Sequence, residues 1–154
     1  MAERQVWDEE KIFKDDIIIE TEHFSVGQDW EIAIPGFYIV APKDKARIRS
    51  VEDLTDEEAT EYIFLVRKVR KAMREALDIK HVYFYRGEDS PFGFHLWMMP
   101  RYAWMDKVAD SGPGSLLPVW KYAKENLNSE KNIKETKEAA KKMRTYLQKK
   151  AKSG

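Results

Sequence analysis

His95 is the residue of this chain best placed to do chemistry. It lies in the run Gly93-Phe94-His95-Leu96-Trp97-Met98-Met99-Pro100-Arg101, whose hydrophobic residues predict a β-strand. Side chains alternate between the two faces of a strand, so Gly93, His95 and Trp97 are expected on one face. A histidine beside a residue without a side chain, and next to an indole, can act near neutral pH as a nucleophile or a proton carrier.

A helix across a sheet is expected to position this strand. The helix is predicted over residues 54–77, with Thr55 as its N-cap and Glu58 closing a capping box. Its apolar residues recur at helical spacing and predict one buried face, made of Ala59, Tyr62, Ile63, Val66, Val69, Met73 and Leu77. The face of the strand opposite His95 should pack against this helix.

Six short segments rich in β-branched or aromatic residues predict the strands, at 17–19, 23–26, 31–34, 37–41, 81–85 and 94–99. Turns are predicted at 35–36 and 88–91, so the last two strands can form a hairpin. After a breaker at 110–115, a short helix is expected over 116–126. A longer helix follows from Ser129, its expected cap, to about residue 150.

The composition is that of one globular domain. The chain has 154 residues, of which 43% are hydrophobic and 35% charged, enough to bury roughly 70% of the surface of the unfolded chain. It has no cysteine, which excludes disulfides, thiolate zinc sites and thiol nucleophiles. No hydrophobic signal region and no apolar stretch near the roughly 20 residues of a membrane span occur. We therefore expect a cytoplasmic protein.

Charge is unevenly distributed along the chain. The net charge is zero, but residues 121–154 contain 11 Lys and Arg against 4 Asp and Glu, a net charge of +7. We divide the chain into an α+β domain at 1–110 and a basic helical extension at 111–154.

The apolar seam of the last helix (Ile133, Ala140, Met143, Leu147) is narrow, which predicts that the helix lies on the surface of the fold or against a partner.

The run around His95 resembles the signature of the histidine triad (HIT) family of nucleotide hydrolases and transferases. That signature has three histidines alternating with hydrophobic residues, often followed by Pro-Arg. Here only the middle histidine is present, because Gly93 and Trp97 occupy the first and third positions. Segments 35–43 (PGFYIVAPK) and 51–58 (VEDLTDEE) also resemble the strand and helix entry of the family. The resemblance runs from about residue 17 to 104.

The resemblance implies a HIT-like α+β fold, with an antiparallel sheet of about five strands, a helix packed across one face and, usually, a homodimer. It also implies that His95 attacks the α-phosphorus of a nucleotide, for example a diadenosine polyphosphate. The nucleotidyl-histidine formed is then resolved by water or another phosphate. The backbone carbonyl of Gly93 would hold the proton on the other ring nitrogen.

Further residues complete the nucleotide-binding site that the resemblance implies. Asp29 matches an acid that binds the ribose hydroxyls, and Ser90 matches a hydroxyl that binds a phosphate oxygen. Trp97 can donate one hydrogen bond but cannot protonate a leaving group, which favours polyphosphates over phosphoramidates. Phosphate charge would be neutralised by cations among Lys43, Lys45, Arg86 and Arg101. As alternatives, Asp29 could start a turn, Ser90 could be an ordinary loop residue, and each cation could be a solvated surface charge.

Two other interpretations stay open beside the favoured one, a nucleotide hydrolase or nucleotidyltransferase. The protein could bind a nucleotide without turnover, or it could be an interaction module whose basic C-terminal helix docks on an acidic partner or nucleic acid. No cofactor is expected. No metal is expected either, since His23 and His81 have no partner at metal-ligand spacing and are expected to be structural or exposed.

Overall fold

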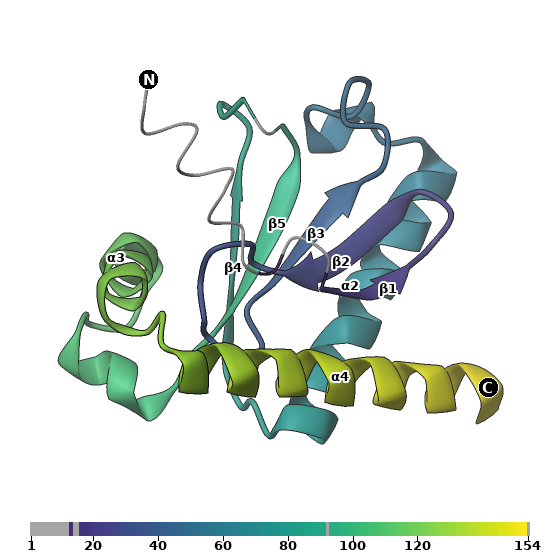
Figure 1. Ribbon diagram of the computed structural model, residues 1–154. Coiled ribbons are helices and arrows are strands. Elements are labelled where there is room, and N and C mark those ends of the chain that lie inside the picture. Colours follow the sequence, from purple (N-terminus) through teal and green to yellow (C-terminus); the bar gives the residue numbers. More distant parts are fainter. Residues whose placement is uncertain (1–12, 14–15, 92, 154) are drawn as a thin grey trace.

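One five-stranded antiparallel sheet organises the computed structural model, which describes residues 13, 16–91 and 93–153 (Figure 1). Its strands are β1 (Ile17–Glu20), β2 (Phe24–Gln28), β3 (Tyr38–Pro42), β4 (Val82–Gly87) and β5 (His95–Pro100), in the spatial order β1-β2-β3-β5-β4. The helices are α2 (Asp56–Leu77), α3 (Leu116–Asn126) and α4 (Glu130–Ser153), with 3₁₀ turns η1 (Val51–Asp53), η2 (Ala103–Lys107) and η3 (Pro113–Ser115). The predicted α+β class is confirmed.

Five of the six predicted strands are present, with ends shifted by one or two residues, but the strand predicted at 31–34 is wrong. That segment is a loop in which Ile32, Ala33 and Ile34 are buried. The side-chain amide of Gln28 donates hydrogen bonds of 3.0 Å to the carbonyls of Ile32 and Ile34. A buried amide thus satisfies carbonyls that a strand would have given to a sheet neighbour.

Strand β5 is packed on both faces, as its alternation predicts. Leu96 and Met98 belong to a core cluster with Val66, Val69 and Met73 of α2. The opposite face, carrying Trp97 and Met99, belongs to a second cluster that also contains Ile34, Phe37, Met105 of η2 and Val119 of α3. The predicted packing of β5 on the helix is therefore confirmed, and His95 lies on the face away from α2.

Helix α2 begins as the capping box predicts, because Thr55 Oγ1 accepts from the backbone of Glu58 and the Glu58 side chain accepts from the backbone of Thr55. Its buried face differs in part. Ile63 is 52% exposed and Ala59 is exposed, whereas Leu65 and Ala72 are buried. The face of α2 that packs against the sheet is therefore rotated about the helix axis from the face that the spacing predicted.

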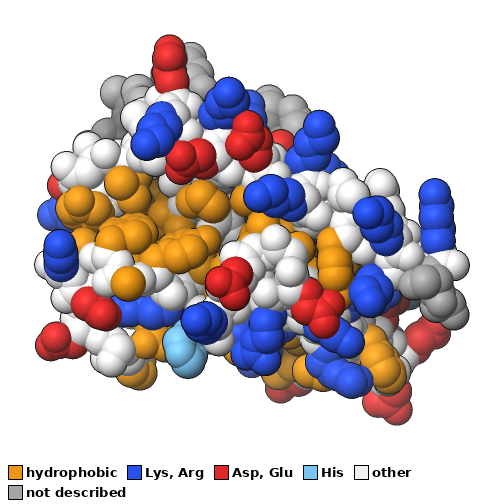
Figure 2. Space-filling model, turned by 90° about the horizontal axis from the view of Figure 1, so that it is seen from below, with side chains coloured by type: hydrophobic (Ala, Val, Ile, Leu, Met, Phe, Trp, Pro, Cys, Tyr) orange, Lys and Arg blue, Asp and Glu red, His pale blue; other side chains and the backbone are white. Residues whose placement is uncertain are grey.

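Both C-terminal helices form where predicted, and α4 packs on this chain's own core. Its residues Ala140, Met143 and Leu147 belong to the same cluster as the buried face of α2. Arg144 donates to the carbonyl of Ile17 in β1. In Figure 1, α4 runs along the bottom of the fold with α3 beside it at the left. From below, Lys and Arg side chains spread over the underside next to an apolar area (Figure 2). Within the described residues, none of the helices is apolar over enough of its length to cross a membrane.

The capping box predicts a measurable stability difference. Thr55→Ala removes the acceptor for the Glu58 amide and should lower the free energy of unfolding by about 1 kcal/mol in urea denaturation. Thr60→Ala is the matched control, because Thr60 Oγ1 bonds only to the carbonyl of Asp56 within the helix. Equal effects of the two substitutions would contradict the assignment of Thr55 as the cap.

Candidate functional site

His95 is fixed in one orientation by a backbone hydrogen bond. Its Nδ1 lies 3.0 Å from the carbonyl oxygen of Gly93, and the residue is 9% exposed. A carbonyl can only accept, so Nδ1 carries the proton and Nε2 holds the free electron pair of the neutral ring. The indole of Trp97 packs edge-on against the imidazole, with ring centroids 4.8 Å apart. His95 is thus oriented as a nucleophile requires.

The hairpin turn before β5 presents the Gly93 carbonyl to the ring. Strand register pairs His95 with Gly87 of β4 and Leu96 with Val40 of β3. Gly93 has a φ of +75°, a left-handed conformation that favours glycine, and its N–H donates to the carbonyl of Ser90. The predicted turn at 88–91 and the glycine after it therefore position the ring.

Ser90 and Lys43 lie at the same end of the sheet as His95. The hydroxyl of Ser90 is buried and has no hydrogen-bond partner within the described part of the chain. Lys43 is exposed directly after β3, and continuing the β3–β5 register places it opposite Gly93. The structure therefore brings Ser90 and Gly93 to the neighbourhood of His95, and the strand register predicts Lys43 at the same end.

Asp29 lies toward the other end of this face and holds a turn. Its Oδ1 accepts from the backbone N–H groups of Glu31 at 3.1 Å and Ile32 at 3.2 Å, and the residue is 5% exposed. Burial raises the pKa of the Asp29 carboxyl to about 7, against the lowering effect of these hydrogen bonds. The turn-forming role that the sequence left open is therefore present. Contact with a ribose stays a prediction.

Arg101 does not share the site with His95. It comes six residues later along β5, which is about 20 Å at 3.3 Å per residue. Its guanidinium donates to Asp106 Oδ1 and to the carbonyl of Ala109, both at 2.8 Å. Arg101 thus ties the segment after β5 to the end of the strand, and a phosphate held at His95 is out of its reach.

Arg86 is also directed elsewhere. Its guanidinium lies 5.2 Å from the ring centroid of Phe94 and interacts with the hydroxyl of Tyr62 on α2. This is the face of the sheet opposite His95. The remaining sequence candidate, Lys45, has its Nζ 5.9 Å from the ring centroid of Trp30.

One cation at the site was not predicted. A Cβ placed on Gly93 would lie 2.8 Å from Nη1 of Arg49, so the guanidinium fills the space where a side chain at position 93 would be. Arg49 Nη2 also donates to the carbonyl of Ser90 at 3.4 Å. The two residues are 41 positions apart in sequence, and no local pattern signals this contact.

His23 has partners that the sequence did not indicate. Its Nδ1 lies 2.7 Å from Glu61 Oε1, and its backbone N–H donates to Glu61 Oε2. This pair ties the turn before β2 to α2 and raises the pKa of the imidazole through the hydrogen bond to Glu61. Glu22, His23 and Glu61 place one potential ligand atom each within 4.8 Å of one another. His81 is exposed.

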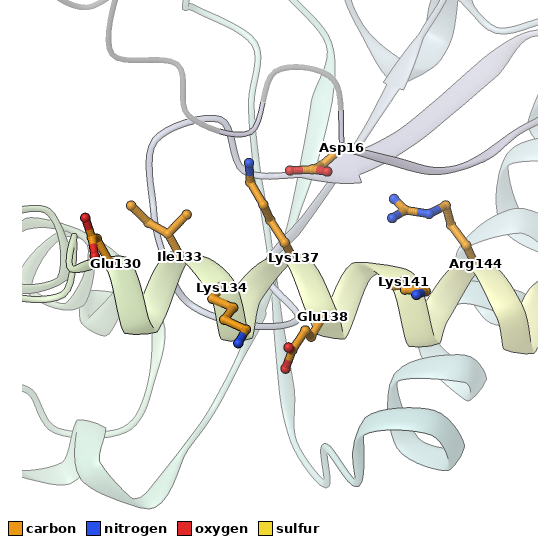
Figure 3. A pocket seen from close by; sticks show the side chains of 8 residues that line it. All are labelled: Asp16, Glu130, Ile133, Lys134, Lys137, Glu138, Lys141 and Arg144. Atoms are coloured by element: carbon orange, nitrogen blue, oxygen red, sulfur yellow. The ribbon is translucent and has the colours of Figure 1, made fainter.

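A surface groove of about 550 Å³ lies away from all predicted site residues, between the start of β1 and α4 (Figure 3). Lys137 and Asp16 point toward each other across it, while Lys134 and Glu138 point away from the sheet. Its lining is of mixed charge, from Asp16, Glu130, Ile133, Lys134, Lys137, Glu138, Lys141 and Arg144. This mixture does not form a site for one kind of ion.

Comparison with known proteins identifies the fold. A zinc-bound histidine triad family protein from Mycobacterium smegmatis superposes with a TM-score of 0.60 at 17% identity, over 90% of this chain and 88% of that one. A hypothetical histidine triad nucleotide-binding protein from Sulfolobus tokodaii gives 0.60 at 15%, over 97% and 93%. A HIT-like protein from Bartonella henselae gives 0.56 at 21%, over 84% of each chain. No protein-family model and no curated protein matches the sequence. The chain therefore has the histidine triad fold.

Asp29 predicts a pH dependence of stability. Its pKa in the folded protein, about 7, exceeds the ordinary value of 3.8, so its contribution is complete below pH 4 and is lost as the pH rises through 7. Asp29→Asn keeps an acceptor for the turn without the buried charge. It should be more stable than wild type by about 1–3 kcal/mol at pH 8 and show no such gain near pH 4, in urea denaturation. The exposed Asp110→Asn is the control, and a gain independent of pH would contradict the assignment.

Proposed function

We propose that this protein is a nucleotide hydrolase or nucleotidyltransferase that acts at the α-phosphate of a nucleoside polyphosphate, with His95 as the nucleophile. The observation that carries the proposal is the hydrogen bond between His95 Nδ1 and the Gly93 carbonyl. This bond fixes the tautomer in which Nε2 can attack. The histidine triad fold, which one solved protein named as nucleotide-binding shares with this chain, supports the same proposal.

The proposed reaction has two steps. Nε2 of His95 forms a bond to the α-phosphorus, while the bond from phosphorus to the bridging oxygen breaks and its electron pair leaves with the rest of the phosphate chain. Water, or the phosphate of a second substrate, then attacks the same phosphorus and releases His95. The Gly93 carbonyl keeps the Nδ1 proton in place and stabilises the charge on the ring during both steps.

Polyphosphates fit this site better than phosphoramidates. Trp97 stands where an acid would protonate the leaving group, and an indole N–H does not give up its proton in water. A pyrophosphate or nucleotide leaves as a stable anion and needs no proton at that moment, whereas an amine does. We therefore propose dinucleoside polyphosphates, such as diadenosine polyphosphates, as the substrate class.

Replacement of the nucleophile tests the proposal. His95→Ala should lower hydrolysis of diadenosine tetraphosphate about a thousandfold or more. An adenylyl adduct should be detectable by intact mass in wild type and absent from the variant. His81→Ala changes an exposed histidine before β4 and should leave both results unchanged.

The same experiment separates the alternatives. If wild type and His95→Ala both bind the nucleotide and neither hydrolyses it, the protein binds nucleotides without catalysing their hydrolysis. Hydrolysis by His95→Ala at the wild-type rate would contradict the catalytic role of His95 outright.

We also propose a homodimer formed along β4. This strand is at one edge of the sheet, so one side of its backbone is open to pairing. Phe84, in the middle of the strand, is 51% exposed, and a large exposed aromatic side chain at an open edge favours association.

A charge on this edge should oppose the dimer. Phe84→Asp is expected to shift the protein from dimer to monomer in sedimentation velocity, because it introduces a charge into an apolar contact. Leu117→Asp on α3, where Leu117 is 73% exposed, is the matched control and should remain dimeric. A monomeric wild type, or a Phe84→Asp protein that is still dimeric, would refute this assembly.

A further inference from the structure

Arg49 lies where the side chain of residue 93 would otherwise be. A Cβ on Gly93 would lie 2.8 Å from Nη1 and 3.3 Å from Cζ of Arg49. The same glycine offers its carbonyl to His95. The guanidinium and the imidazole therefore both lie at Gly93, one where its side chain would be and the other at its carbonyl. A positive charge therefore lies at the turn that orients the proposed nucleophile.

The backbone of Arg49 is held in place, but its charge is available. The N–H groups of Arg49 and Ser50 both donate to Asp53 Oδ2 at 2.9 Å, which anchors the segment between β3 and η1. The guanidinium donates to the carbonyl of Ser90. Within residues 13, 16–91 and 93–153, no carboxylate forms an ion pair with it. Most of its five N–H donors can thus bind another acceptor.

Ser90 gives a second and independent indication of a ligand. Its hydroxyl is buried without a hydrogen-bond partner in the described part of the chain, in the turn that Arg49 contacts. Buried hydroxyl groups in folded proteins are normally hydrogen-bonded. An oxyanion bound at this turn would give both Ser90 and Arg49 an acceptor.

The order of the residues along the sheet predicts the orientation of a nucleotide bound on this face. The Asp29 N–H donates to the carbonyl of Phe37, and the next residue, Tyr38, pairs with Met98 near the far end of β5. Gly93 and Arg49 lie beyond the opposite end, with His95 between them and Asp29. A nucleotide with its α-phosphate at His95 and its nucleoside toward Asp29 would extend its remaining phosphates toward Arg49.

We propose that Arg49 binds the phosphate chain beyond the α-phosphate and thereby selects nucleoside polyphosphates over monophosphates. This inference rests on the proposed function. A guanidinium keeps its protons in proteins, so Arg49 neutralises the charge of the departing phosphate chain and does not protonate it. Arg49 thereby assists a leaving group that departs as an anion.

The test compares ligands that differ only in phosphate content, by isothermal titration calorimetry with AMP, ATP and inorganic tripolyphosphate. Arg49→Ala should weaken binding of ATP and tripolyphosphate about tenfold or more and change binding of AMP much less. Arg49→Lys should recover part of the affinity. Arg67→Ala is the matched control, because Arg67 is an exposed arginine of α2 whose guanidinium lies 5.5 Å from the ring centroid of Phe64.

The outcomes distinguish this inference from the proposed function. Equal losses for AMP and ATP, or no loss for either, would overturn the role of Arg49 while nucleotide binding stands. Tripolyphosphate binding that requires Arg49, in a protein that binds no AMP, would support Arg49 as a polyphosphate-binding residue and reject the nucleotide assignment. A wild-type protein that binds none of the three ligands overturns both.

Discussion

Packing of β5 between two hydrophobic clusters is the constraint on which the site depends. Leu96 and Met98 are buried against α2. On the other face, Met99 is buried and Trp97 partly buried among residues of the loop after β2, η2 and α3. A shift of one residue in register would exchange these two sets between faces. Because both sets are needed in their clusters, His95 is confined to the face away from α2, next to Trp97.

The glycine at position 93 has structural consequences of its own. Gly93 adopts a φ of +75°, which a histidine adopts at a cost, and the Arg49 guanidinium occupies the space where a side chain would lie. A side chain there would strain the turn and displace the guanidinium. The glycine thus allows one turn both to take up the Arg49 guanidinium and to offer its carbonyl to His95.

Features encoded by neighbouring residues were predictable from the sequence, and features that depend on distant residues were not. The cap of α2, the hairpin turn and the face of His95 follow from local spacing and alternation. The loop at 31–34 has strand-like composition, but the buried amide of Gln28 takes its carbonyls. Arg49 approaches Gly93, and Glu61 approaches His23, only because the fold joins residues about 40 positions apart. Arg101 was predicted near the phosphate from its place in the sequence motif. The six residues of β5 that precede Arg101 are extended, however, and hold its side chain about 20 Å from that of His95.

The C-terminal extension covers one end of the face that carries His95. Residues of α4 complete the core beside α2, so its apolar seam is used within the chain and its basic residues face outward. Lys124 of α3 pairs with Glu31 in the turn that Asp29 holds, and Asp29 is buried there. The Asp29 end of the face, where we propose that the nucleoside binds, is therefore covered by the chain itself. The opposite end, at the Gly93 turn, combines His95, an exposed arginine and a hydroxyl that has no hydrogen-bond partner among the described residues. Discrimination among ligands should accordingly depend more on their phosphates than on their base.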